Sequence, residues 1–316
     1  MYTLLDFYAG VGGISLGFQL TKTVKTIFAV DYDNYCKITY DKNHKQKLLI
    51  QDISTLKKED IPKADIISLG FNCQPFSIAG EQKGFDDKRT DSLSNIFNII
   101  KYIKPKCVFM ENVKNLLTHD NGNSLKKIIK SLQNCNMKTI IYHIYNTSEY
   151  TGIPQNRERL FIISFSKKIS NKFINDMFNF PKIPIKSWKL FLEKEIPEKY
   201  YYSNQSKIYL TLNNNIKNSN SIYQYRRGIV RENKNNVCPT LVAVMGTGGH
   251  NVPIINDKNK IRKLTPKECF NLQGFPDNFI LPDISDSHLY KQCGNSVTVP
   301  LIYILAKSIV HILNNY

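Results

Sequence analysis

The 316-residue chain has little that would tie it to a metal, an oxidising compartment or a membrane. Its 7 cysteines are scattered and no C-x-x-C pair occurs, so neither a zinc site nor a disulfide framework is supported. The opening MYTLLDFYAGVGG lacks the basic start and long apolar core of a signal peptide, and no apolar run is long enough to span a membrane. We therefore expect a cytoplasmic protein with no metal and no membrane contact.

Acidic residues are also scarce. Aspartate and glutamate number 26 against 43 lysines and arginines, which gives a net charge of +17. A chain this basic favours a polyanionic partner, and nucleic acid is the first candidate. The alternative is a basic protein that is merely soluble.

Short apolar runs alternate with segments of helical length up to about residue 165. The runs are rich in isoleucine, valine and phenylalanine and often end in a polar residue, which predicts strands. The alternation predicts an α/β fold with a mostly parallel sheet and helices on both faces. The predicted strands are 3–9, 26–31, 47–52, 64–70, 107–112, 139–145 and 159–165, and the predicted helices include 91–104 and 123–135.

The α/β rhythm is lost after residue 166. Residues 182–234 are rich in lysine, arginine and asparagine. We expect a smaller, irregular, basic domain over about 170–285, with a disordered insert as the alternative for the asparagine-rich part. The apolar stretch LTPKECFNLQGFP (264–276) argues against disorder at that point.

Polar residues come at or just after five predicted strand ends. Ligands of open α/β sheets bind beyond the carboxyl ends of the strands. Chance would place one or two such residues there, so five indicate a functional site. These residues are Asp6, Asp31, Asp52, Cys73 and Glu111.

A glycine-rich loop follows the first predicted strand. DFYAGVGGISLGF places Gly10, Gly12 and Gly13 between a strand and a helix, and Asp31 ends the next strand. Glycines allow close approach of a nucleotide-like ligand, and an acid at that distance can bind ribose hydroxyls. The spacing is not G-x-G-x-x-G, which disfavours nicotinamide or flavin. An ordinary tight turn is the alternative.

Cys73 stands in LGFNCQPFSIAG, directly after a predicted strand. A lone cysteine is usually a small buried hydrophobe, but the turn-rich surroundings of this one favour exposure. A parallel neighbouring strand ends at Glu111, while Arg157 and Arg159 project to one side of a later strand. A thiol, a carboxyl and two guanidiniums suit covalent addition to an electron-poor heteroaromatic ring. Surface ion pairing is the alternative for the charged residues taken singly.

Six motifs in order resemble those of the DNA (cytosine-5)-methyltransferase family, of the bacterial or phage restriction–modification type. The resemblance runs from about residue 3 to 310, interrupted by a variable region. The motifs are DFYAGVGG for the cofactor, GFNCQPFS for the nucleophile, ENV for the glutamate, QNRERLFII for the paired arginines, RKLTPKECFNLQGFPDNF supporting the recognition domain, and YKQCGNSVTVPLI returning to the cofactor site.

The resemblance implies a Rossmann-like fold dependent on S-adenosylmethionine, with S-adenosylhomocysteine as product. Residues 1–170 would form the catalytic and cofactor-binding domain, 171–285 the target-recognition domain, and 286–316 a C-terminal segment returning to the catalytic domain. Asp31 would bind the ribose. The implied cofactor contacts are Tyr8, Gly10, Gly12, Gly13, Asp31, Tyr32, Asp52, Ile53, Asn72, Asn295 and Val297.

The same resemblance implies the chemistry. The thiolate of Cys73 would attack carbon 6 of a flipped-out cytosine, and carbon 5 would then take the methyl group. Glu111 would bind the cytosine edge and assist protonation at nitrogen 3. Arg159 would contact the base carbonyl, and Arg157 would help to hold the loop or the base. The sequence does not identify the base that removes the carbon-5 proton.

The implied partner is double-stranded DNA, bound by a monomer. A cognate restriction endonuclease would share the DNA site without binding this protein. We expect a short, G/C-containing, near-palindromic site; for any single arginine a solvated face is the alternative. The expected DNA contacts are Gln74, Ser77, Arg226, Arg227, Arg231, Thr240, Leu241 and Gly248.

Two features depart from the family pattern. Asn72 stands where the family usually has proline, and DKRTDSLSNIF (87–97) lacks the usual glycine-plus-aromatic pattern. Proline restricts the backbone on both sides, so we expect reduced but real activity. Asn72→Pro should raise the rate, and an unchanged rate would contradict this.

Two other functions stay open on the sequence alone. One is an RNA cytosine methyltransferase that modifies transfer RNA, which the long basic insert and its Thr-Leu pair disfavour. The other is a catalytically silent DNA-binding relative, which Asn72 favours and the intact Cys73, Glu111, Arg157 and Arg159 disfavour.

Overall fold

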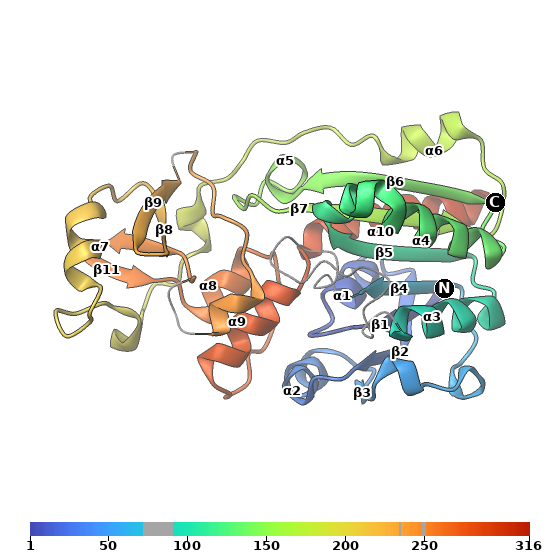
Figure 1. The fold of residues 1–316 in the computed structure, drawn as a ribbon, viewed down its shortest axis with the longest axis horizontal. Coiled ribbons are helices and arrows are strands. Elements are labelled where there is room, and N and C mark those ends of the chain that lie inside the picture. The colour runs from blue at the N-terminus through green and yellow to red at the C-terminus, as the bar shows by residue number, and fades with distance from the viewer. Residues whose placement is uncertain (72–90, 234, 248–250) are drawn as a thin grey trace. The chain divides into compact units, whose positions relative to one another are not determined.

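A computed structural model describes residues 1–71, 91–233, 235–247 and 251–316. These residues form two compact units, each discontinuous in sequence (Figure 1). The first unit comprises 1–145, 158–181 and 300–316, and the second comprises 146–157 and 182–299.

The first unit is built on a seven-stranded, mostly parallel sheet, as the sequence predicts. Strands β1 to β5 pair in parallel in the order β3-β2-β1-β4-β5, and β7 pairs antiparallel with β5 and adjoins β6. All seven predicted strands are present. They are β1 (Tyr2–Phe7), β2 (Val24–Asp31), β3 (Leu49–Ile50), β4 (Ile66–Gly70), β5 (Cys107–Val113), β6 (Thr139–Asn146) and β7 (Glu158–Phe165).

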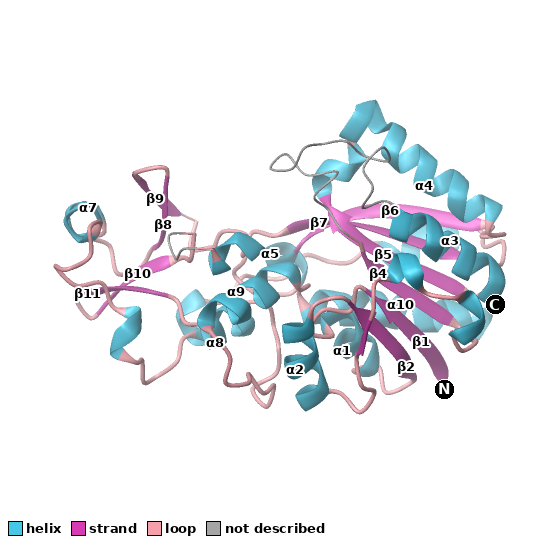
Figure 2. Ribbon diagram, turned by 60° about the horizontal axis from the view of Figure 1, so that its bottom comes forward, coloured by secondary structure: helices cyan, strands magenta, loops and turns pink. Residues whose placement is uncertain are grey.

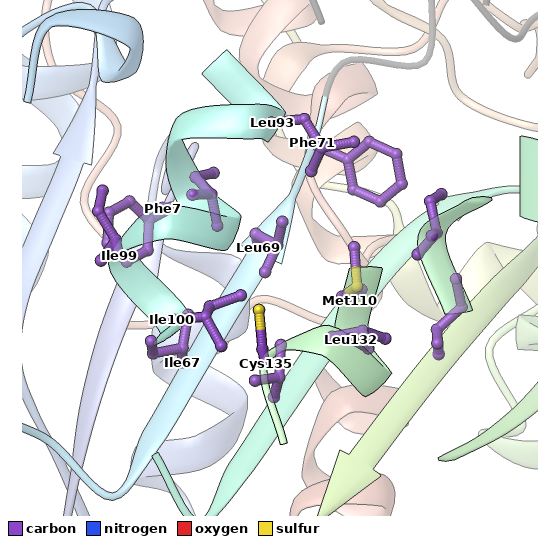
Figure 3. Packing of buried hydrophobic residues seen from close by; sticks show 14 of the residues in the cluster. Phe7, Ile67, Leu69, Phe71, Leu93, Ile99, Ile100, Met110, Leu132 and Cys135 are labelled. Atoms are coloured by element: carbon purple, nitrogen blue, oxygen red, sulfur yellow. The ribbon is translucent and has the colours of Figure 1, made fainter. Parts of the chain in front are cut away.

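Helices α3 (Asp91–Ile103) and α4 (Asn123–Asn134) cover one face of this sheet (Figure 2). Alternate strand residues such as Ile67 and Leu69 point to the same face because the side-chain period of a strand is two. Each buried side chain of this size contributes about 1.5–3 kcal/mol. The residues that Figure 3 labels in this core are Phe7, Ile67, Leu69, Phe71, Leu93, Ile99, Ile100, Met110, Leu132 and Cys135.

Helices α1 (Gly13–Gln19) and α10 (Val299–Asn315) meet on the other face. A Cβ atom on Gly17 would lie 2.5 Å from the Cβ of Ile302, so only glycine permits this approach. Phe18 of α1 packs edge-on against Phe109 of β5, with ring centroids 5.4 Å apart. The unit also contains α2 (Asn34–Asn43) and α6 (Asn171–Phe178).

The stretch Asp286–Asn315 is long and apolar enough, by length and composition alone, to cross a membrane. However, 61% of its most apolar part is buried inside the protein. Burial on this scale is typical of a core helix, which is the place that α10 takes in the first unit.

The second unit contains a four-stranded antiparallel sheet that the sequence did not reveal. Its order is β11-β10-β8-β9, and the asparagine-rich stretch beside it forms helix α7. These strands are four or five residues long and carry charged residues, so no apolar alternation marks them. The elements are α5 (Thr147–Tyr150), α7 (Tyr209–Asn215), β8 (Ile222–Arg226), β9 (Ile229–Asn233), β10 (Ile254–Asp257), β11 (Lys260–Lys263), α8 (Pro266–Asn271) and α9 (Asp286–Asn295).

Candidate active site

The carboxyl ends of the parallel strands form one edge in the first unit. Phe7 of β1 pairs with Val30 of β2 and with Leu69 of β4. At the next position along β4, Gly70 pairs with Glu111 of β5. The polar residues predicted at strand ends are therefore brought to this edge, except where they fall outside the described residues.

The glycine-rich loop at this edge has a special backbone. Tyr8, Gly10 and Gly12 have φ values of 55°, 55° and 82°, and Gly13 begins α1. A Cβ atom on Gly12 would lie 2.2 Å from Nε2 of His44, so the position requires glycine for both its φ and its packing. A Cβ atom on Gly10 would meet no atom of the described residues within 4 Å. Among these residues the backbone is therefore closely packed at Gly12 and not at Gly10.

Asp31 presents a buried carboxylate beside this loop. Its Oδ2 accepts a hydrogen bond from the backbone N–H of Gly10 at 2.8 Å, and its Oδ1 accepts one from Asp33 at 3.0 Å. Burial raises the pKa of this carboxyl. Each carboxylate oxygen can accept a second hydrogen bond. Tyr32, the next residue, is 68% exposed.

Asp6 and Tyr8 form further hydrogen bonds at the glycine-rich loop. Asp6 is fully buried and accepts hydrogen bonds from the hydroxyls of Ser15 at 2.6 Å and Ser68 at 2.7 Å. Burial raises the pKa of Asp6 to about 6. The hydroxyl of Tyr8 lies 2.6 Å from that of Ser92 in α3, and burial raises the pKa of Tyr8 to about 12.

Asp52 and Ile53 stand just beyond β3. The carboxylate of Asp52 accepts from the backbone N–H of Ser54 at 2.8 Å and thereby caps a short 3-10 turn. Ile53 is buried, and its carbonyl accepts a hydrogen bond from Asn95 of α3 at 2.8 Å. The turn thus holds the Asp52 carboxylate exposed at the end of β3.

Glu111 and Arg159 form an ion pair across strands β5 and β7. Glu111 Oε1 lies 3.1 Å from Nε of Arg159, and the two side chains are only 11% and 15% exposed. Glu111 Oε2 lies 3.7 Å from the position of a Cβ on Gly70. The structure therefore brings together two of the predicted catalytic residues, above the end of the strand that precedes Cys73 in sequence.

Asn112 is a residue that sequence reasoning missed. Its side-chain amide donates to the carbonyl of Phe71 at 3.2 Å and so holds the chain two residues before Cys73. Its place in the ENV motif was the available signal. Five predicted site residues lie outside the described residues: Asn72, Cys73, Gln74, Ser77 and Gly248.

Arg157 belongs to the second unit and is only 2% exposed. Its guanidinium donates to the carbonyl of Leu241 at 2.8 Å, to that of Gly294 at 3.2 Å, and to that of Ser296. Arg157 therefore ties the predicted recognition segment to the segment that carries Asn295 and Val297. Of these two, Asn295 is exposed and Val297 is buried.

Two buried amides, also missed from the sequence, reinforce this junction. Gln155 donates to the carbonyl of Leu272 at 2.7 Å and accepts from the backbone N–H of Leu241 at 3.2 Å. Gln273 donates to the carbonyl of Cys293 at 3.0 Å and accepts from the Thr298 hydroxyl at 3.0 Å. Both glutamines are 0% exposed. In the sequence, the available signal for this role is that each glutamine lies inside one of the six motifs.

The remaining predicted DNA contacts lie in the second unit. Arg226 ends β8, Arg227 is in the turn that follows, and Arg231 is in β9. The hydroxyl of Thr240 donates to the carbonyl of Asn156 at 2.5 Å. Among the described residues, no group of three or more histidine, cysteine or acidic side chains is placed to hold a metal ion.

A family model matches almost the whole chain. The model for C-5 cytosine-specific DNA methylase matches residues 2–311. The type II methyltransferase M.Bsp6I of Bacillus sp. (strain RFL6) is 45% identical over 318 residues, which covers 98% of each chain. The type II methyltransferase M.HaeII of Haemophilus aegyptius is 36% identical, covering 99% of this chain and 94% of that protein.

Solved structures share the fold. The S. pombe Dnmt2 methyltransferase superposes with a TM-score of 0.78 over 100% of both chains at 19% identity. The methyltransferase EhMeth of Entamoeba histolytica gives the same TM-score over 99% of both chains at 18% identity. At these identities the match speaks for the fold alone.

Proposed function

Because the chain belongs to the C-5 cytosine-specific DNA methylase family, as its motifs indicate, we propose that it methylates carbon 5 of a flipped-out cytosine in a short, specific duplex DNA site. It is a DNA (cytosine-5-)-methyltransferase. One observation carries the proposal for this site: the buried Glu111–Arg159 pair lies at the same sheet edge as the glycine-rich loop.

S-adenosylmethionine is the proposed methyl donor, with S-adenosylhomocysteine as product. The edge of the first unit fits a nucleoside. Asp31 retains acceptor capacity for ribose hydroxyls, the exposed ring of Tyr32 offers a stacking surface, and no atom of the described residues lies within 4 Å of a Cβ placed on Gly10. Asp52 presents a second carboxylate. The further proposed contacts are Tyr8, Gly12, Gly13, Ile53, Asn72, Asn295 and Val297.

Cys73 is the proposed nucleophile. Its thiolate adds to carbon 6 of the cytosine, and the electron pair displaced toward carbon 5 takes the methyl group. A base then removes the carbon-5 proton, and elimination returns the electron pair to sulfur. Asn112 donates to the carbonyl of Phe71, two residues before Cys73 in sequence.

Glu111 and Arg159 are proposed to hold the ring during addition. Glu111 binds the exocyclic amine and nitrogen 3 and favours protonation there, which makes carbon 6 more electrophilic. Arg159 orients the carboxylate of Glu111 at 3.1 Å and donates to the base carbonyl. Arg157, buried on backbone carbonyls, acts as a positioning residue.

The proposed partner is double-stranded DNA, bound by a monomer. Relatives at 45% and 36% identity are named type II methyltransferases, so a restriction endonuclease sharing the site is part of the proposal. The protein would act in the cytoplasm, on the nucleoid. Its proposed DNA contacts are Gln74, Ser77, Arg226, Arg227, Arg231, Thr240, Leu241 and Gly248.

The test is methyl transfer from labelled S-adenosylmethionine to duplex DNA that covers many short sites. We expect label on cytosine with the parent protein and none with Cys73→Ser. Transfer to transfer RNA but not to DNA would favour the RNA reaction instead. Salt-sensitive DNA binding without transfer to either would indicate a silent DNA-binding protein.

A further inference from the structure

The β8–β9 hairpin of the second unit has a tightly defined geometry. Arg227 and Gly228 form its two-residue turn, with φ values of 53° and 77°. Positive φ at both central positions is the mark of a type I′ turn, which matches the twist of the flanking strands. A turn of this kind fixes the register of the two strands, and therefore the face on which each side chain lies.

One face of the hairpin is a packing face. Tyr223 belongs to the apolar cluster formed with Leu212 and Ile216 at helix α7. Tyr225 and Val230, which pair across the hairpin, pack against the same cluster. On this face Tyr223 is buried, and Tyr225 and Val230 are half-buried against the cluster.

The opposite face carries a different set of side chains, which we name the outer hairpin face. The register pairs Gln224 with Arg231 and Arg226 with Ile229 on this side. Both arginines are exposed, and Ile229 is 56% exposed. Ile222, on the same face at the base of the hairpin, is buried. The face is thus covered at its base and open toward its tip.

The outer hairpin face has the composition of a base-reading surface. In the described parts of the chain, neither Arg226 nor Arg231 forms an ion pair, although the chain has 26 acidic residues. The exposed Ile229 lies opposite Arg226 and two residues before Arg231 on the same face. Phosphates attract cations but gain nothing from an apolar side chain, whereas the edges of bases provide both acceptors and apolar surface.

We propose that the outer hairpin face enters the major groove and reads two guanines, one through Arg226 and one through Arg231. The proposal rests on the proposed function, whose partner is duplex DNA. The major groove admits a two-stranded β-ribbon, and a guanidinium fork matches O6 and N7 of guanine. Gln224, directly opposite Arg231, can orient its guanidinium, while Ile229 packs against a pyrimidine edge.

The register also predicts the spacing of the two guanines. Arg231 lies opposite Gln224, which is two residues along the hairpin from Arg226. Two strand residues span about 7 Å, which is close to two base-pair steps at about 3.4 Å each. The two guanines should therefore be about two base pairs apart in the site.

The test compares the DNA sequences bound by lysine variants. The parent, Arg226→Lys and Arg231→Lys are each mixed with a pool of random duplexes, and the bound fraction is sequenced. Lysine keeps the charge for a phosphate but lacks the bidentate fork. We expect each variant to lose about 5- to 150-fold of its preference for guanine at one position. Lys217→Arg, at an exposed position of the same unit, is the control and should keep the parental preference.

The outcomes separate this proposal from the proposed function. Unchanged base preferences in both variants, from a parent that selects a sequence, would overturn the reading of guanine by this face. A parent that selects a sequence but transfers no methyl group would contradict the proposed reaction and leave the hairpin result valid. A parent that binds no duplex would overturn both. Matching thermal unfolding curves would establish that the variants are folded.

Discussion

Asp6 shows how a single buried carboxyl makes stability depend on pH. It is fully buried under the glycine-rich loop, and its raised pKa of about 6 reflects the cost of burying a charge. The folded-state pKa lies above the ordinary value, so this contribution to stability is complete below about pH 4. It is lost as the pH rises through about 6.

Asp6→Asn should therefore remove a pH dependence. Between pH 4.5 and 7.5 the parent should lose roughly 2 kcal/mol of stability relative to the variant. Urea unfolding at the two pH values measures this difference. Asp60→Asn, at an exposed position, is the matched control. Equal pH slopes for the parent and the Asp6 variant would show that the burial has no such effect.

Substitutions of the two arginines of the QNRER motif should have different effects on activity and on stability. Arg159 pairs with Glu111 at the sheet edge, whereas Arg157 is buried on backbone carbonyls. We expect Arg159→Ala to lower kcat about 100-fold or more at temperatures where the variant is fully folded. We expect Arg157→Ala to lower the unfolding free energy by about 1–3 kcal/mol, because buried carbonyls lose their donor. Measuring kcat and the unfolding free energy of both variants tests this difference. Equal changes in kcat and in unfolding free energy for the two variants would contradict it.

At the scale of elements, the buried amides of the second unit join segments that lie far apart in sequence. Gln273 donates to the carbonyl of Cys293 and accepts from the hydroxyl of Thr298 and the side-chain amide of Gln155, and these three partners are buried. Gln273→Leu removes all three hydrogen bonds, so we expect a loss of about 2–4 kcal/mol in unfolding free energy. Gln205→Leu, at an exposed glutamine of the same unit, should change it by less than about 0.5 kcal/mol. Chemical unfolding of the two variants measures the difference, and equal losses would contradict the role.

The elements also show what the sequence could reveal. Strands β1 to β7 were predictable because apolar runs such as ADIISLG are buried on both faces of the sheet. Strands β8 to β11 were not, because short segments such as IYQYR and KIRK carry charged residues that break the apolar pattern. Residues 146–157 belong to the second unit, where Gln155 and Arg157 form hydrogen bonds to Leu272 and Leu241. No periodicity in sequence encodes such bonds.

The candidate site was predictable in part for a related reason. The positions of Asp31 and Glu111 follow from the rule that ligands bind beyond the carboxyl ends of parallel strands. The antiparallel placement of β7, which brings Arg159 to Glu111, does not follow from that rule. Asn112 was overlooked because its role depends on one hydrogen bond to a backbone carbonyl.

At the scale of the whole molecule, the net charge of +17 should govern DNA binding. Each phosphate contact releases counterions, so affinity falls linearly with salt on logarithmic axes. We expect a loss of at least about 100-fold in duplex affinity between 50 and 200 mM salt. Fluorescence anisotropy with a labelled duplex measures it, and binding of S-adenosylmethionine without DNA is the control. A duplex affinity that does not change with salt concentration would contradict an interface dominated by phosphate contacts.

The meeting of α1 and α10 has a consequence for how the protein is made. Gly17, near the start of the chain, packs against Ile302, near its end. A ribosome must therefore translate the whole second unit before it supplies the helix that meets α1 on that face of the sheet. Until then, apolar strand residues on that face of the sheet stay exposed in the nascent chain. During this time the chain can bind chaperones or aggregate. The first unit can complete its folding only once synthesis has passed residue 302.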